Sequence, residues 1–358
     1  ACKSKDLYIV LLYLNNMGLQ IGNEENNQPT KKSDLFSSAN ESCARIAYLC
    51  SDSIPVFPIT PATPMSVFCE DSASRGETNL WGSTPFISVM QSEAGASGVL
   101  HGSLRSGVLA SSFTSSQGLL LMFPEMCKIA GERLPGVLHV ASRSLAFSSL
   151  SIFGDHSDVM SVRSAGWIML SSYNTQSAHD LALISHALAL RCRLPVLHFF
   201  DGFSVSHKLQ NYSPLSKDII NNLIEKEDVL FHRNRALRSY NPKIVVGAQT
   251  PDSYFEGRVA NSFAYDKVNK IFSELCKEFS NYTNRAYRSC EYVGLPSAET
   301  IIVVMGSDSS TIKELVKKNH FLGCVIITLF SPFPVNDFIS LLPKSAKKIL
   351  VLDKCEEN

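Results

Sequence analysis

The chain has 358 residues, of which 45% are hydrophobic and 18% are charged, a composition typical of a folded protein with a large buried core. The 33 basic and 33 acidic side chains balance to a formal net charge of zero. This balance offers no basic face, so it argues against nucleic acid and anionic membrane surfaces as partners. The length predicts two domains.

Ten cysteines are spread along the chain, and no two of them form a C-x-x-C pair. Several lie in apolar runs, such as Cys127 and Cys324. Buried reduced thiols explain this distribution better than disulfides, which predicts an intracellular, reducing compartment: the cytosol, a mitochondrion or a hydrogenosome. Zinc and iron–sulfur sites need clustered thiolates, so we expect no metal site on this chain.

The segment Leu7–Leu14 is the only one that suggests a membrane, and its eight residues cannot span a bilayer, which needs about 20. It is interpreted either as the remnant of a targeting segment or as an element that packs on a neighbour. The polar stretch Gly22–Ser38 is predicted to be a linker. Residues 1–38 are therefore taken as an extension whose role is not assigned.

From Ser42 onward, short apolar runs alternate with helical patterns. The apolar runs lack polar alternation and are bounded by Gly, Pro or Ser, as expected of strands buried on both faces. The predicted strands are Ile54–Ile59, Phe86–Met90, Val108–Phe113, Gly136–Ala141, Trp167–Leu170 and Val196–Phe200. The predicted helices are Ser42–Leu49, Ala94–Leu104, Leu119–Ile129 and Thr175–Leu190, the last with Asn174 as its N-cap. This alternation predicts a parallel, doubly wound α/β sheet.

A second, smaller α/β unit is predicted after a charged, less regular stretch at Asn211–Asn241 and a connecting helix at Val259–Phe279. Its predicted elements are, in chain order, strand Ile301–Met305, helix Thr311–Lys318, and strands Cys324–Leu329 and Ile349–Leu352. The chain stops six residues later, so we expect this domain to be truncated. The predicted division is a first domain over 39–255, a connecting segment over 256–296, and a second domain over 297–358.

Motifs for a dinucleotide fingerprint, a P-loop and a nucleophile elbow are absent. Polar residues do stand at predicted strand ends, where ligands bind in sheets of this kind. Thr60 lies among three prolines in FPITPATPM, Glu93 opens a helix in VMQSEAGASG, and Arg143 directly follows an apolar strand. Each also has a structural interpretation from pattern alone: an ordinary turn for Thr60, helix capping for Glu93, and a salt bridge for Arg143.

Two further polar groups are interpreted as structural. The run GDHSD at 154–158 contains the residue types of a hydrolase triad, but consecutive side chains point in different directions and cannot form one. His198, in HFFDGF, is interpreted as a core histidine whose hydrogen bonds are satisfied.

Taken together, these segments resemble one family. FPITPATPM, NLWG, VMQSEAGASGVLHGSLRSG, FTSSQGLLLM, CKIAGERLPGVLHVASRS, LSIFGDHSDVMSVR, LPVLHFFDGF and NPKIVVGAQTPDSYFEGR are similar to segments of pyruvate:ferredoxin oxidoreductases and their flavodoxin- and NADP-linked relatives. Their order and spacing agree from about Asn40 to Leu352, and MQSEAG and SIFGDHSDV are the most specific.

The resemblance implies a thiamine diphosphate-binding fold, with this chain as the pyrimidine-binding domain and part of a transketolase-C-like domain. It implies that Glu93 is catalytic and hydrogen-bonds N1′ of the thiamine aminopyrimidine. Thr60 and Arg143 match the residues that contact pyruvate, and Pro58 matches one that lines the cofactor pocket. An arginine suits this task because its planar guanidinium pairs bidentately with a carboxylate.

The resemblance also implies an incomplete site. The Mg²⁺-linked diphosphate site, the iron–sulfur clusters and most coenzyme A contacts belong to parts of the family outside this chain. We therefore expect the chain alone to hold half of the thiamine site and to be inactive. The expected partners are pyruvate, the remaining domains or subunits, and a second copy in a homodimer. The electron acceptor is not encoded in this region.

Two alternatives stay open: a non-catalytic relative that acts as a scaffold or as a subunit of a larger complex, and a subunit of a heteromeric oxoacid oxidoreductase. Phe147 and Ser148 stand where the family commonly has Thr-His, four and five residues after Arg143. The family's F-R-T-S-H-E is likewise replaced by Phe203–Lys208. The first of these departures bears on how substrate is handled.

Overall fold

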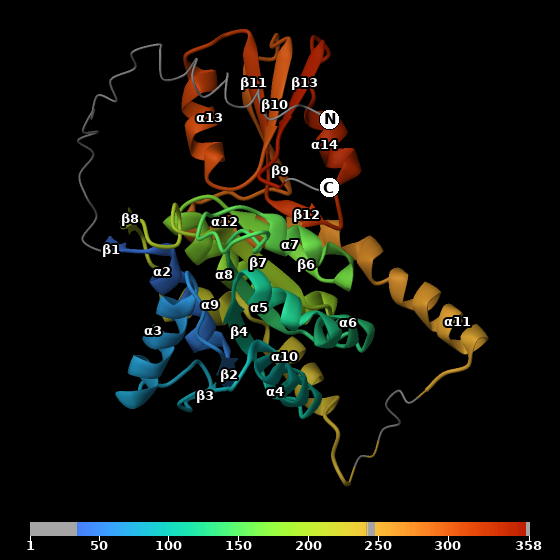
Figure 1. Ribbon diagram of the computed structural model, residues 1–358. Helices are drawn as coiled ribbons and strands as arrows, with labels where there is room; N and C mark the ends of the chain where they lie inside the picture. The colour runs from blue at the N-terminus through green and yellow to red at the C-terminus, as the bar shows by residue number, and fades with distance from the viewer. Residues whose placement is uncertain (1–33, 241, 243–247, 356–358) are drawn as a thin grey trace. The chain divides into compact units, whose positions relative to one another are not determined.

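The computed structural model describes residues 34–240, 242 and 248–355 (Figure 1). By its internal contacts, the chain from Leu35 onward forms one unit. The segment Leu7–Leu14 and most of the predicted extension lie outside the described residues. At the end of that extension, β1 (Leu35–Ser37) pairs antiparallel with β8 (Gln210–Tyr212).

The main sheet is built from parallel strands, as predicted. One sheet has the order β12-β6-β7-β5-β4, and a second pair, β2-β3, adjoins it where Ser53 bridges to Ala110 beside β4. The antiparallel member is β12, which pairs with β6. The strands are β2 (Ser53–Val56), β3 (Phe86–Val89), β4 (Ser111–Thr114), β5 (Val137–Ser142), β6 (Ile168–Ser172), β7 (Val196–Asp201) and β12 (Leu329–Ser331).

Helices cover both faces of this sheet, because successive side chains of a strand point to opposite sides. On β5, Val137 and Ala141 join one core cluster, while Leu138 and Val140 join the other. The first cluster includes α2 (Ala39–Cys50), α3 (Thr63–Ser74), α8 (Thr175–Cys192) and α12 (Val268–Thr283). The second includes α4 (Glu93–Arg105), α5 (Ser116–Leu121), α6 (Phe123–Gly131) and α7 (Ser157–Ser161). The doubly wound α/β prediction is confirmed.

Helix α8 begins as its sequence predicts. The Asn174 side chain accepts a hydrogen bond from the backbone N–H of Ser177 at 2.7 Å, and the Ser177 hydroxyl accepts one from the N–H of Asn174 at 3.0 Å. This reciprocal capping satisfies two donors that a helix start leaves free.

Two predicted helices are each split in the structure. The segment predicted as Leu119–Ile129 forms α5 and α6, and Pro124 at the start of α6 lacks the N–H that a continuous helix would need. The segment predicted as Val259–Phe279 forms parts of α11 (Pro251–Ser262) and α12, with a 3₁₀ turn at Tyr265–Lys267 between them. The less regular stretch holds β8, α9 (Lys217–Leu223) and α10 (Lys226–Asn234).

A second, four-stranded sheet has the order β13-β10-β11-β9. Three of its strands match the predicted ones: β10 (Thr300–Val304), β11 (Leu322–Ile327) and β13 (Lys348–Leu352). The strand β9 (Cys290–Gly294) was not predicted and pairs antiparallel with β11. Figure 1 shows α13 (Asp308–Lys317) and α14 (Val335–Leu341) on opposite sides of this sheet. The division of the chain at residues 255 and 296 stays a prediction.

Asp201, at the carboxyl end of β7, joins the two sheets through a buried polar cluster. Its carboxylate accepts hydrogen bonds from His156 Nε2 at 2.8 Å and from the Ser307 hydroxyl at 2.6 Å, and it forms an ion pair with Lys354. Burial alone would raise the pKa of Asp201, but His156 and Lys354 more than offset it, so this pKa lies below its usual range. We call these four residues the Asp201 cluster.

Within the residues that the structure describes, no helix is both long and apolar enough to cross a membrane.

Candidate functional site

Four neighbouring parallel strands, β2, β3, β4 and β5, end at the same edge of the main sheet. The loops after them carry the predicted residues: Thr60 follows β2, Glu93 follows β3, and Arg143 follows β5. The first turn of α5, Ser116–Gly118, follows β4 and contacts both Arg143 and Glu93. The structure thus brings the three predicted residues to one edge.

Arg143 is only 7% exposed, yet it has no ion-pair partner among the described residues. Its guanidinium donates to the backbone carbonyl of Thr60 at 2.7 Å and to Gln117 Oε1 at 3.3 Å, while its buried Nε has no partner. A buried guanidinium is costly unless an anion balances it. Because the protein supplies neutral acceptors here, the arrangement suits an anionic ligand. The salt-bridge interpretation of Arg143 finds no support among the described residues.

Glu93 is the first residue of α4 and is 5% exposed. The N-cap of this helix is Ser92, whose hydroxyl accepts from the N–H of Gly95 at 3.2 Å, so Glu93 is not needed as the cap. Among the described residues, no hydrogen-bond or ion-pair partner reaches the Glu93 carboxylate. Buried polar groups are nearly always paired, so an unpaired carboxyl at a strand end marks a candidate ligand contact.

Gly118 leaves the space that the Glu93 side chain occupies. A Cβ on Gly118 would lie 2.5 Å from Glu93 Oε1 and 2.8 Å from Thr114 Oγ1. Thr114 Oγ1 and the neighbouring Ser115 Oγ are also buried without partners. Any side chain at position 118 would therefore displace the carboxyl group.

Thr60 and Pro58 lie on the rim of this edge. Both are exposed in the loop between β2 and α3, and Thr60 touches Arg143 through its carbonyl. Phe147, one of the two departures from the family pattern, is 89% exposed in the loop that follows Arg143. Its effect on substrate handling stays a prediction.

Asp158 lies beneath the site and is completely buried. Burial raises the pKa of its carboxyl to about 7, against the opposing effect of backbone N–H groups from Arg143, Ser116 and Val159. Sequence reasoning missed Gln117, Gly118 and Asp158 as site residues. The available signal was their position, since FTSSQG follows β4 at the shared edge and Asp158 belongs to the family-specific run SIFGDHSDV.

A second group of polar side chains lies inside the core. Donor atoms of Cys43, His139 and His198 lie within 4.8 Å of one another. His139 Nδ1 and His198 Nδ1 are 3.0 Å apart, and His198 Nε2 is 2.7 Å from the Ser172 hydroxyl. Burial lowers the pKa of His198 to about 3, so its imidazole stays neutral. The hydrogen bonds of His198 agree with its interpretation as a satisfied core residue.

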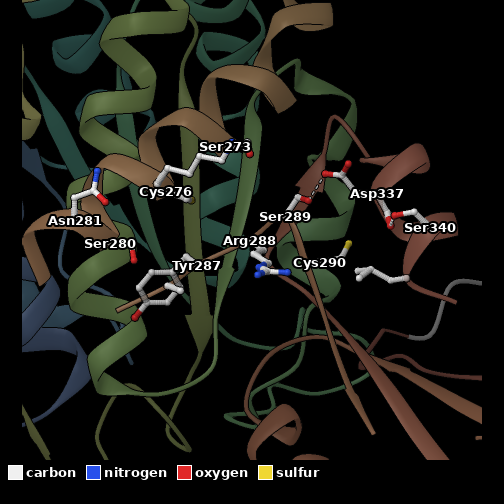
Figure 2. Close-up of a pocket in the computed structure, with 13 residues that line it drawn as sticks. Ser273, Cys276, Ser280, Asn281, Tyr287, Arg288, Ser289, Cys290, Asp337 and Ser340 are labelled. Carbon is white, nitrogen blue, oxygen red and sulfur yellow. Dashed lines mark hydrogen bonds between the residues drawn. The ribbon is translucent and has the colours of Figure 1, made fainter. Parts of the chain in front are cut away.

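The pocket drawn in Figure 2 is lined by none of the predicted site residues, and its volume is about 500 Å³. Its wall includes Tyr287, Arg288 and Ser289 from the segment before β9, and Asp337 from α14. The Ser289 hydroxyl donates to Asp337 at 2.6 Å. The predicted site residues therefore lie at the strand-end edge and not in this cavity.

Comparison with known proteins identifies the family of the chain. Residues 45–277 match the family described as "Pyruvate flavodoxin/ferredoxin oxidoreductase, thiamine diP-bdg". The chain belongs to this family. The match is to the family's N-terminal region, and it includes Thr60, Glu93 and Arg143.

The curated relatives of the chain include proteins that are 41–47% identical to it. A putative pyruvate-flavodoxin oxidoreductase of Synechocystis is 47% identical over 89% of the chain. The mitochondrial pyruvate dehydrogenase [NADP(+)] of Euglena gracilis is 41% identical over 92% of it. The chain spans 27% of the first protein's length and 19% of the second's, but 80% of a pyruvate-flavodoxin oxidoreductase from Nostoc.

A solved structure of a 2-oxoglutarate:ferredoxin oxidoreductase from Magnetococcus marinus, with 2-oxoglutarate, coenzyme A and succinyl-CoA bound, shares the fold. It matches 97% of this chain and 62% of its own, with a TM-score of 0.67 and 15% identity. At that identity the likeness concerns the fold alone.

Proposed function

We propose that the complete protein is a thiamine diphosphate-dependent oxidoreductase that decarboxylates pyruvate oxidatively to acetyl-CoA and CO₂. This chain would supply the contacts to the aminopyrimidine and to the substrate. One observation carries the proposal: two buried charged side chains lie at the same edge of the sheet. The Glu93 carboxyl has no hydrogen-bond partner among the described residues, and the Arg143 guanidinium has no counter-ion there. Pyruvate is proposed as the substrate because the names of the relatives contain it.

The residues present fit half of a thiamine diphosphate site. When bound, this cofactor supplies a carbon nucleophile for the carbonyl of a 2-oxoacid. Glu93 would hold a proton at N1′ of the pyrimidine, because its carboxyl is buried and free of protein partners. The exposed loop at Pro58 would line the pocket. Mg²⁺, iron–sulfur clusters and most coenzyme A contacts are proposed to belong to other parts of the protein.

Arg143 and Thr60 would bind the substrate. The guanidinium is already oriented by the Thr60 carbonyl and Gln117, and among the described residues it has no carboxylate partner that would neutralise its charge. A preformed cation that is not neutralised by the protein favours an anionic substrate over a neutral ketone. Thr60 is exposed and its backbone carbonyl accepts from that cation, so its side chain would contact the same substrate.

A reducing compartment and a homodimer remain part of the proposal. Burial raises the pKa of the Cys50 and Cys69 thiols well above their usual range and that of the Cys276 thiol to about 12. Such thiols remain protonated and unreactive, as suits cysteines that serve as small core residues.

Pyruvate-dependent reduction of a viologen dye by the full-length protein tests this function. Glu93→Gln keeps the side-chain volume, but an amide cannot exchange a proton as a carboxyl does. We therefore expect kcat to fall by about 10²-fold or more. Glu77→Gln is the control, because Glu77 is exposed and pairs with Arg75 outside the site. Equal activity of Glu93→Gln and wild type would end the assignment of Glu93. No activity in either protein would favour the alternative of a non-catalytic scaffold.

A further inference from the structure

The buried carboxylate of Asp158 ties together two turns that carry the site. Its Oδ2 accepts the backbone N–H of Ser116 at 2.8 Å and that of Arg143 at 3.0 Å, while Oδ1 accepts the N–H of Val159 at 2.8 Å. Ser116 follows β4 and Arg143 follows β5, so one side chain fixes the ends of two neighbouring strands. The Asp158 side chain itself is wholly buried beneath the site.

The turn at Ser116 needs such a restraint. Ser116 has a φ of 51°, a left-handed conformation that costs a non-glycine residue about 1–3 kcal/mol and persists only when its surroundings hold it. The Ser116 hydroxyl donates to the carbonyl of Ser144 at 2.7 Å, which adds a second tie to the segment after Arg143. Without the Asp158 carboxylate, the N–H of Ser116 would be buried and unpaired.

The conformation of this turn decides where the next two residues lie. Gln117 accepts a hydrogen bond from the Arg143 guanidinium, and Gly118 provides the space for the Glu93 carboxyl. Asp158 therefore acts on Arg143 twice, through its backbone N–H and through Gln117. It acts on Glu93 through Gly118.

We propose that Asp158 is a positioning residue, which holds Arg143 and the Ser116–Gly118 turn in the geometry that binds the 2-oxoacid substrate. Asp158 has no direct contact with the proposed ligands. This inference rests on the proposed function of the site. A substitution of Asp158 is therefore expected to weaken substrate binding as well as to lower the stability of the fold.

The test is the steady-state kinetics of the full-length protein carrying Asp158→Asn. An amide has one acceptor oxygen in place of two, so it cannot satisfy all three N–H groups. We expect KM for pyruvate to rise about tenfold, because the guanidinium is displaced from the substrate carboxylate. Asp180→Asn is the matched control: Asp180 is also wholly buried, but it pairs with Arg285 and Tyr287 away from the site. It should lower stability and leave KM unchanged.

A second variant separates positioning from a general loss of stability. Glycine adopts a positive φ without cost, so adding Ser116→Gly to Asp158→Asn should lower KM part of the way back toward wild type. If Asp158→Asn does not fold, Gln117→Ala is measured instead. It removes the hydrogen bond from the Arg143 guanidinium to Gln117, and Gln117 is partly exposed, so the fold should tolerate the change. An unchanged KM in the variant that folds would overturn the inference.

Arg143→Lys distinguishes this failure from failure of the proposed function. It keeps the charge but loses the planar fork, so KM for pyruvate should rise. If Arg143→Lys leaves KM unchanged, the substrate site itself is wrong. If Arg143→Lys raises KM and Asp158→Asn does not, only the positioning role of Asp158 fails.

Discussion

A missing side chain matters as much to this site as the charged ones. Glu93 reaches its buried position only because Gly118 has no Cβ, and a methyl group there would lie 2.5 Å from Glu93 Oε1. We therefore predict that Gly118→Ala lowers the pyruvate-dependent activity of the full-length protein by about 10²-fold, similar to the loss of a positioned acid–base group.

Gly98→Ala in α4 is the control for this substitution. Apart from the backbone of its own helix, a Cβ at Gly98 would have no atom within 4 Å, and alanine stabilises a helix interior by about 0.5–1 kcal/mol relative to glycine. Its activity should equal that of wild type. Full activity of Gly118→Ala would show that the position of the Glu93 carboxyl is not needed for turnover.

At the scale of secondary-structure elements, the Asp201 cluster connects the main sheet to the second sheet. Asp201 ends β7, Ser307 precedes α13, and Lys354 follows β13. A Cβ on Gly306 would lie 2.5 Å from Asp201 Oδ1, so this approach of the two sheets requires glycine. Gly202, which directly follows Asp201 in the sequence, packs against Ser142 and Pro61. These two residues are the chain neighbours of Arg143 and Thr60. The cluster thus adjoins the site.

Breaking the ion pair in this cluster should destabilise the chain. Lys354→Met leaves the buried Asp201 carboxylate without its cation, and we expect the free energy of unfolding to fall by about 2 kcal/mol. Urea denaturation of the chain measures this as a lower midpoint. Lys347→Met, which removes an exposed pair with Glu299, should change stability by less than about 0.5 kcal/mol. Equal midpoints for both variants would contradict the account of the cluster.

The sequence predicted the main sheet well because buried parallel strands are short apolar runs with clear boundaries. It failed where elements depend on tertiary contacts. Only the first residue of β9, Cys290, is buried, and the strand exists through its antiparallel pairing with β11. The break between α5 and α6 could have been predicted from Pro124, which the apolar pattern on both sides obscured.

The candidate site was predicted in part. Thr60, Glu93 and Arg143 stand at strand ends, and a parallel sheet brings such ends together. Gln117, Gly118 and Asp158 could not be assigned in the same way, because their importance comes from contacts between loops: a bond to Arg143, a space for Glu93, and N–H groups from two turns. Contacts of this kind, between loops distant in the sequence, cannot be predicted from the order of residues along the chain.

At the scale of the whole molecule, the proposed site has a buried base and an exposed rim. Asp158, Glu93 and Arg143 are buried, whereas Thr60 and Phe147 are exposed. The chain spans 27% of the length of the Synechocystis relative. In the proposed enzyme, other parts of the protein would cover this rim and bind the diphosphate.

The most direct measurement is a cryo-EM structure of the full-length protein with thiamine diphosphate, Mg²⁺ and pyruvate. We predict ligand density at the edge formed by the ends of β2, β3, β4 and β5. The Glu93 carboxyl should lie within hydrogen-bond distance of a pyrimidine nitrogen, at about 2.6–3.2 Å, with the Arg143 guanidinium facing the substrate carboxylate. Density for the cofactor away from this edge, with Glu93 still unpartnered, would contradict the central claim.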